Sequence, residues 1–105
     1  MAVPLGAPSY SGSTAVQPGW LATTYAVGQV ITADFGTPIN GATSYSYAFY
    51  RNGVAIPGAS GTTASRQQTY VAVAADSGAI ISCRVGPINS LASGATVSFG
   101  GIYVQ

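Results

Sequence analysis

The stretch FYRNGVAIPGAS, residues 49–60, decides the fold. Its Asn-Gly pair at 52–53 tolerates positive φ at both positions, as a type I′ turn requires, and the twist of that turn matches a β-hairpin. Its Pro-Gly pair at 57–58 suits the two central positions of a type II turn. The stretch therefore predicts a strand, a tight turn, a short return strand over residues 54–56 and a second turn.

On either side of this hairpin, three segments alternate apolar and other residues with the period of two that is typical of a half-buried strand. They cover residues 27–36, 44–51 and 76–86. Further strands are predicted at 69–75 and 95–105, with Gly100-Gly101 as a bulge or kink. We expect the core to contain Ile31, Ala33, Tyr47, Phe49, Ile81, Cys83 and Val85.

The other segments are rich in turn and loop residues. Residues 59–68 are predicted to be a polar crossing and residues 87–94 a loop. About seven short strands with turns between them, and no helical periodicity, are the signature of a β-sandwich or barrel. The chain has 105 residues, a length that suits one compact domain.

The first 26 residues differ in character, with three prolines separated by small residues. We interpret residues 1–26 as an N-terminal arm and contact segment, and residues 27–105 as the sandwich domain. An edge strand is predicted near residues 7–12, because proline is tolerated at a sheet edge.

The charge content is unusually low. Only 5% of residues are charged, against about 25% in an ordinary globular domain. The charged residues are Asp34, Arg51, Arg66, Asp76 and Arg84. A freely diffusing protein usually carries more charge, so two interpretations stay open: a neutral extracellular-type module, or a subunit packed in a larger assembly.

Several classes of partner are not expected. The net charge of +1 gives no electrostatic case for nucleic acid or an anionic membrane, and no apolar stretch approaches the length of a membrane span. The N-terminal sequence lacks the basic start and apolar core of a secretory signal. If Met1 is the native start, we expect synthesis in a reducing cytoplasm.

Catalytic chemistry is also not expected, so we predict no enzyme, no cofactor and no metal site. The chain has no His, Lys or Glu, which removes the usual bases for a serine nucleophile. Asp76 is expected to accept backbone N–H bonds in the turn before a strand, and Asp34 to do similar local work. The single cysteine, Cys83, is expected to be a small buried hydrophobe and has no intrachain disulfide partner.

Residues 49–85 resemble the immunoglobulin-like domains that occur, often in tandem, on bacterial surface proteins and phage virion proteins. The matching pieces are FYRNGVAIPGAS, TYVAVAAD and DSGAIISCRV. VGQVITADFG resembles the second strand of the family and INSLASGATVS its last hairpin, so the resemblance covers about residues 27–98. It implies an immunoglobulin-like β-sandwich of about seven antiparallel strands, here with an extended N-terminal arm.

The chain departs from the family at two core positions. Phe49 stands where the family usually has a tryptophan. The partner of Cys83 in the family disulfide is missing, and the register that the resemblance implies places Ala33 opposite Cys83.

Four residues are candidates for contact with a partner: Tyr10, Trp20, Tyr25 and Arg51. Trp20 is preferred among them because it lies outside the sandwich pattern, and aromatic residues are enriched at interface centres. Arg51, at the hairpin tip, has the geometry to bind a carboxylate with two hydrogen bonds.

Two functions follow as expectations. The first is a structural virion protein, a phage capsid or tail decoration protein that binds the major capsid protein, another virion protein or itself as a homo-oligomer. It would be made in the host cytoplasm without a signal peptide and lie on the virion surface. The alternative is an adhesive module that recognises a host-surface glycan or a cell-surface protein, because exposed aromatic rings also stack on sugars.

Overall fold

The computed structural model describes residues 6–11, 14–21 and 24–105, and for Thr24 the backbone without the side chain. The strands are β1 (Gly19–Trp20), β2 (Thr24–Tyr25), β3 (Val30–Asp34), β4 (Ser44–Arg51), β5 (Val54–Thr63), β6 (Gln67–Val71), β7 (Ile80–Ile88) and β8 (Val97–Val104). A short 3₁₀ turn, η1 (Ala74–Asp76), lies between β6 and β7. The edge strand predicted near residues 7–12 includes residue 12, which lies outside the described residues.

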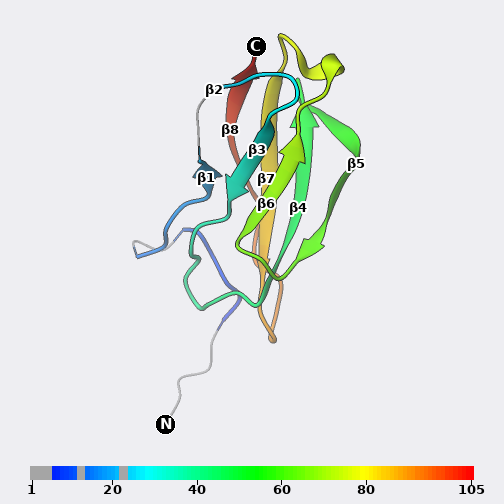
Figure 1. Ribbon diagram of the computed structural model, residues 1–105. Coiled ribbons are helices and arrows are strands. Elements are labelled where there is room, and N and C mark those ends of the chain that lie inside the picture. The colour runs from blue at the N-terminus through cyan, green and yellow to red at the C-terminus, as the bar shows by residue number, and fades with distance from the viewer. Residues whose placement is uncertain (1–5, 12–13, 22–23) are drawn as a thin grey trace.

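These strands form two sheets. The smaller has the order β1-β3-β6 and the larger the order β2-β8-β7-β4-β5. All neighbours are antiparallel except the two-residue β2, which runs parallel to β8. Figure 1 shows β3 and β6 lying in front of β4 and β7. Apart from β2, the described chain thus has seven antiparallel strands, three facing four, which confirms the predicted all-β sandwich.

The hairpin that decided the fold has the predicted turn. Asn52 and Gly53 have φ values of 50° and 82°, as both central positions of a type I′ turn require. Arg51 and Val54 pair across the turn, so β4 and β5 form a tight antiparallel hairpin.

The return strand is longer than predicted, and the polar crossing expected at 59–68 is wrong. Ala55 pairs with Tyr50, whereas Ser60 pairs with Ala48, so the Pro-Gly pair at 57–58 lies in a bulge within β5. The strand then continues to Thr63. A segment rich in Gly, Ser and Thr pairs here because ladder hydrogen bonds use only main-chain groups.

The strand predicted at 69–75 ends early, at Val71. The Asp76 carboxylate accepts the Val73 N–H at 2.9 Å, and the Asp76 N–H donates to the Val73 carbonyl at the same distance. These two bonds fold the chain into η1. By contrast, the predicted bulge at Gly100-Gly101 is present, because the β7–β8 register shifts there.

The expected core residues lie between the sheets. Ile31, Ala33, Phe49, Ile81, Cys83 and Val85 are all buried, and Tyr47 is partly buried against them. Ring contacts run through this core, with centroid separations of 5.2 Å for Phe35–Tyr45, 6.2 Å for Phe35–Tyr47, 6.0 Å for Tyr47–Phe49 and 5.5 Å for Phe49–Tyr70. Such spacings are favourable for aromatic pairs.

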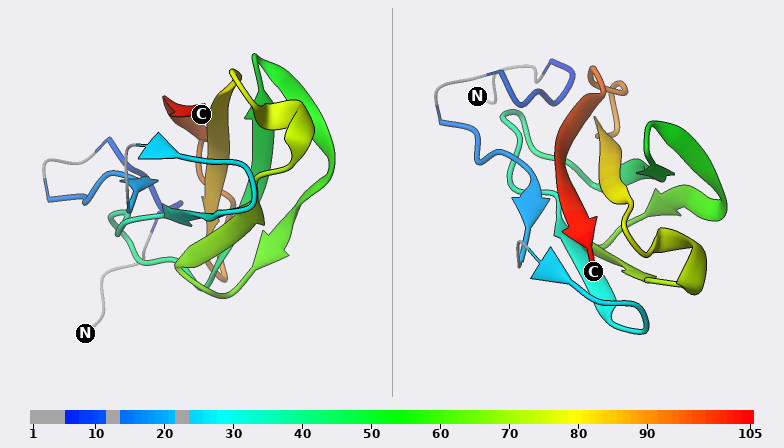
Figure 2. Two further views of the ribbon diagram at one scale, coloured as in Figure 1. Left: turned by 45° about the horizontal axis from the view of Figure 1, so that its top comes forward. Right: turned by 90° about the horizontal axis from the view of Figure 1, so that it is seen from above.

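Several described residues among the first 26 pair with or pack on the sandwich, and Figure 2 shows β1 and β2 beside it. Tyr10 is buried and its hydroxyl donates to the Phe35 carbonyl at 2.6 Å. Ser9 and Val16 form bridges with Ile39 and Thr37, and β1 and β2 join different sheets. The described residues on both sides of position 26 therefore share one core, because the early aromatic side chains are buried in it.

Gly36 lies under this segment, and its replacement tests the packing. A Cβ at Gly36 would lie 2.2 Å from the Val16 carbonyl oxygen, whereas one at Gly41 would meet nothing within 4 Å. The two glycines have almost the same φ, 68° and 67°. We expect Gly36→Ala to lower the free energy of unfolding by about 1–3 kcal/mol more than Gly41→Ala, because overpacking adds to a shared backbone strain.

Urea unfolding followed by tryptophan fluorescence measures the difference between these two variants. Equal losses of unfolding free energy for both variants would show that the backbone at Val16 leaves room for a side chain at position 36.

The register that the resemblance implies, with Ala33 opposite Cys83, can be tested with a disulfide. Both are fully buried in one cluster and come from opposite sheets, on β3 and β7. We expect Ala33→Cys to oxidise with Cys83 and to raise the free energy of unfolding by about 2–4 kcal/mol, because the crosslink restricts the unfolded chain. Thiol titration and urea unfolding, with Ala33→Ser as control, measure this. Failure to oxidise in the folded protein would contradict the implied register.

Candidate functional site

The Asp76 carboxylate is the centre of a buried polar network. It is fully buried and accepts hydrogen bonds from Arg51 Nε at 2.5 Å, the Tyr70 hydroxyl at 2.6 Å and the Val73 N–H at 2.9 Å. The backbone contact is the one that the sequence predicted. Arg51 comes from β4 and Tyr70 from β6, so the carboxylate connects the two sheets.

The network keeps Asp76 ionised. Burial by itself would raise the pKa of Asp76, but the hydrogen bonds from Tyr70, Val73 and Arg51 outweigh it and hold the pKa below its usual value. The hydrogen bond to Asp76 raises the pKa of Arg51, and burial raises the pKa of Tyr70. A carboxylate with a lowered pKa stays ionised near neutral pH, so Asp76 is suited to link the two sheets and is poorly suited to transfer protons.

A second ion pair lies at the surface of the smaller sheet. Asp34 accepts the Gly36 N–H at 2.8 Å and Gln67 Nε2 at 3.0 Å, and Arg66 Nε lies 3.4 Å from its Oδ1. Burial would raise the pKa of Asp34, but the bonds from Gln67 and Gly36 and the nearby Arg66 charge lower it. Asp34 thus accepts a backbone N–H bond from a residue close to it in the chain, as was expected.

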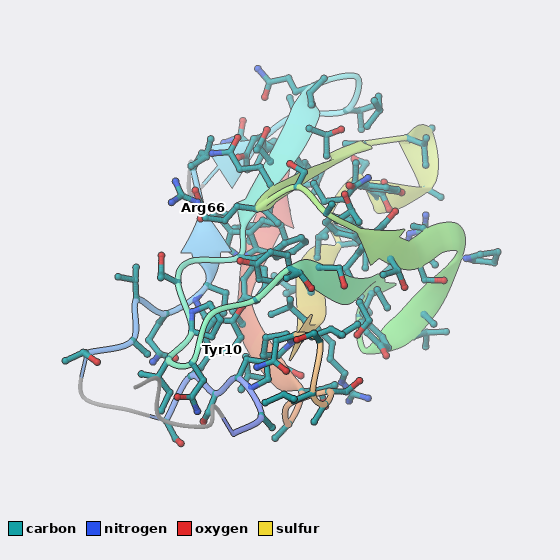
Figure 3. All side chains as sticks on the ribbon, turned by 90° about the horizontal axis from the view of Figure 1, so that it is seen from below. Tyr10 and Arg66 are labelled. Carbon is teal, nitrogen blue, oxygen red and sulfur yellow. The ribbon has the colours of Figure 1, made fainter. Side chains whose placement is uncertain are left out.

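Beside this pair the surface opens into a cleft of about 350 Å³, here called the β1 cleft. Its lining side chains are Val16, Gln17, Trp20, Leu21, Asp34, Thr37 and Arg66. Val16, Trp20 and Leu21 are its apolar part, here called the apolar wall, and Gln17, Asp34, Thr37 and Arg66 are its polar part, called the polar wall. Figure 3 shows Arg66 on the β1 side of the molecule, away from Tyr10.

Trp20 belongs partly to the core and partly to the β1 cleft. Its ring lies 4.9 Å from the Phe99 ring and 6.2 Å from the Phe49 ring, and its Nε1 donates to the Gly100 carbonyl. The side chain is partly buried and also lines the cleft. Among the four contact candidates, Trp20 is therefore the one that borders an open site.

The other three candidates are placed differently. Tyr10 and Tyr25 are buried in the core, and Arg51 is committed to Asp76. The burial of the tyrosines was not visible in the sequence, because a bridge or a two-residue strand shows no alternating pattern. The structure therefore does not bring the four candidates together into one surface.

Sequence reasoning did not find the β1 cleft. Its polar wall depends on pairing between β3 and β6, which places Asp34 beside Gln67 and close to Arg66. No local motif reports such a pairing. The only available signal was that these residues include two of the few charges in the chain.

Cys83 has the environment of a structural cysteine. It is buried, and burial raises the pKa of its thiol to about 12. The reactive thiolate is then scarce at neutral pH. Within residues 6–11, 14–21 and 24–105, no three side chains of the His, Cys, Asp and Glu types gather to hold a metal. The same residues contain no helix with the length and hydrophobicity to cross a bilayer.

The surface combines exposed apolar side chains with internally paired charges. The large exposed ones are Val16, Leu21, Val27, Val30, Val54, Val71, Val73, Ile80, Leu91 and Tyr103. Two ion pairs take up four of the five charged side chains, and Arg84 lies over the Tyr50 ring at 5.4 Å. The described surface therefore carries few charges, and the most exposed of them are those of Arg66 and Arg84.

Comparison with protein-family models, curated proteins and solved structures finds no match to this chain.

The Asp76 network predicts how stability depends on pH. The pKa of Asp76 is lower in the folded than in the unfolded chain, so its contribution is present above the unfolded value of about 3.9 and is lost as the pH falls through the folded value. We expect Asp76→Asn to lower the free energy of unfolding at pH 7 by about 2 kcal/mol or more, because buried donors lose a charged acceptor. The free energy of unfolding of this variant should also depend less on pH in the acid range.

Urea unfolding at neutral and acid pH measures both effects. Asp34→Asn is the matched control, with a smaller expected loss because Asp34 is partly exposed. An Asp76→Asn variant that keeps the full acid dependence of the parent would refute this role.

Proposed function

We propose that this chain is a structural virion protein, a phage capsid or tail decoration protein that docks on the particle surface through an immunoglobulin-like domain and performs no catalysis. The observation that carries the proposal is the combination of internally paired charges with many exposed apolar side chains. Its partner is the major capsid protein, another virion protein or a second copy of the chain.

The strand order supports the immunoglobulin-like part of the proposal. In immunoglobulin-type sandwiches the second and fifth strands share one sheet, and the third, sixth and seventh share the other. The order β1-β3-β6 facing β8-β7-β4 fits this pattern when β1 and β2 are taken together as the first strand. The additional β5 beside β4 corresponds to the extra strand of variable-type domains.

The surface supports an assembly role over a freely diffusing one. Soluble domains usually keep a net charge well away from zero and avoid apolar patches. Here Val30 and Val71 pair across β3 and β6 and are each 52% exposed. Such a surface is better suited to a subunit that is covered by neighbours, since charged residues are depleted at interface cores.

The packing of the described N-terminal residues limits which surfaces are available for docking. An arm draped over a neighbour would need free backbone, but Tyr10 and Trp20 are part of the core. Docking is therefore assigned to the sheet faces and the β1 cleft. Deleting residues 1–26 would remove core side chains, so it is not a clean test of assembly.

Particle binding tests the proposal directly. We expect the chain to remain on washed particles of the phage that encodes it, at a fixed ratio to the major capsid or tail protein. Particles made without the chain should bind the recombinant domain saturably, because docking needs a finite lattice of sites. Quantitative mass spectrometry and co-sedimentation measure these quantities, with capsid-free lysate as control. A chain that is absent from washed particles and does not sediment with them would overturn the virion role.

The β1 cleft also favours a second candidate, an adhesive module for a host-surface glycan or a cell-surface protein. Its concave shape and its mixture of apolar and polar lining residues are typical of surfaces that carry such recognition. Binding to intact host cells, without retention on particles, would support this alternative. A glycan array without hits would count against its glycan form.

A further inference from the structure

We infer that the β1 cleft binds an acidic polypeptide segment from a different protein, with aliphatic side chains against Val16 and Leu21 and a carboxylate on Arg66. This goes beyond the virion role, because it names a binding site and its ligand chemistry. It would stand equally if the domain belonged to another kind of assembly.

Arg66 has hydrogen-bond donors that meet no acceptor within the described part of the chain. Its Nε lies 3.4 Å from Asp34 Oδ1, which already accepts the Gly36 N–H at 2.8 Å. Its terminal N–H groups have no hydrogen-bond partner among the described residues, and its side chain is 59% exposed. The planar fork of a guanidinium matches a carboxylate with two parallel hydrogen bonds. Arg66 is therefore available to a carboxylate from outside the chain.

The apolar wall supplies the second half of the site. Val16 and Leu21 are 58% and 60% exposed, with the partly buried Trp20 beside them. Apolar contacts bordered by polar groups are the usual arrangement of an interface anchor. A cleft of about 350 Å³ lies at the small end of ligand sites, which suits one or two side chains.

The wall is held in place before any ligand arrives. Val16 and Thr37 exchange backbone hydrogen bonds of 2.8 and 2.9 Å, and the Leu21 N–H donates to the Thr32 carbonyl at 3.2 Å. Gly36 leaves just enough room for the chain to cross at Val16. A preformed wall lowers the entropy cost of binding.

The contacts of Trp20 favour a peptide over a sugar. Sugars stack on exposed aromatic faces, but the Trp20 ring packs against Phe49 and Phe99, and its Nε1 is bonded to the Gly100 carbonyl. No other aromatic side chain lines the cleft among the described residues. Branched aliphatic groups provide the rest of the apolar surface, and they fit leucine, isoleucine or valine.

A second copy of this chain cannot supply the acidic side chain. The chain has only two carboxylate side chains. Asp76 is fully buried with three partners, and both oxygens of Asp34 already accept hydrogen bonds, from Gly36 and Gln67. Charge complementarity therefore points to a different protein with exposed Asp or Glu.

A blocked pentapeptide of sequence Ala-Leu-Asp-Leu-Ala is the probe, and its Asn counterpart is the control peptide. Titration into ¹⁵N-labelled protein is followed by two-dimensional NMR, in which the indole N–H of the single tryptophan reports on the site. We expect saturable shifts at Trp20, Leu21 and Thr37, and about tenfold weaker binding of the Asn peptide, as expected for loss of a charge-assisted pair.

Arg66→Gln should weaken binding of the Asp peptide by the same factor and abolish the preference for Asp over Asn. Arg84→Gln is the matched control, since Arg84 is exposed on the other sheet, and it should leave binding unchanged. Leu21→Thr tests the apolar wall separately and should also weaken binding. The spectra of the free variants show whether each is folded.

Three outcomes would overturn the inference. Equal binding of the Asp and Asn peptides would remove the carboxylate anchor. Shifts at these residues with glucuronic acid but not with the peptide would replace the peptide by an acidic sugar. No shift with any probe at its solubility limit would remove the site. None of these results bears on retention of the chain by particles, so the two proposals fail separately.

Discussion

The carboxylate of Asp76 is the interaction on which the arrangement of the two sheets depends. It receives Arg51 from the larger sheet and Tyr70 from the smaller, and its bond to the Val73 N–H fixes the turn that carries the chain from one sheet to the other. No disulfide is available for this task, because Cys83 is the only cysteine. A buried charge with all its partners in place imposes one geometry, since any displacement would leave donors unpaired in a low-dielectric interior.

A second link between the sheets comes from the N-terminal segment. Trp20, on the edge strand of the smaller sheet, packs on Phe49 and Phe99 and donates to the Gly100 carbonyl of the larger sheet. Phe49 is buried in this core on β4, and Trp20 brings an indole to the same core from another strand. Residues 1–26, which were interpreted from the sequence as an arm and contact segment, therefore contribute side chains to the core. This contribution explains why their aromatic residues are buried.

Features that depend on neighbouring residues were predictable from the sequence, and features that depend on distant pairing were not. The Asn-Gly turn, the alternating core of β3, β4 and β7 and the Gly100-Gly101 bulge follow from local chemistry. The length of β5 did not, because an edge strand pairs through its backbone and needs no apolar side chains. The burial of Tyr10 and the whole β1 cleft arise from contacts between segments far apart in the chain.

The pairing of charges within the fold also determines how this surface can recognise a partner. With nearly all charges neutralised internally, little long-range field remains to steer a partner toward the domain. Recognition then depends on short-range contact, namely shape, apolar burial and those donors of Arg66 that are unpaired within the described residues. The apolar contacts form slowly but are little affected by salt, because screening acts on charges. Slow association and lasting contact suit a subunit that binds once and stays bound. The virion proposal and the peptide site share this property, because both use a surface whose affinity comes from direct contact and not from long-range electrostatic attraction.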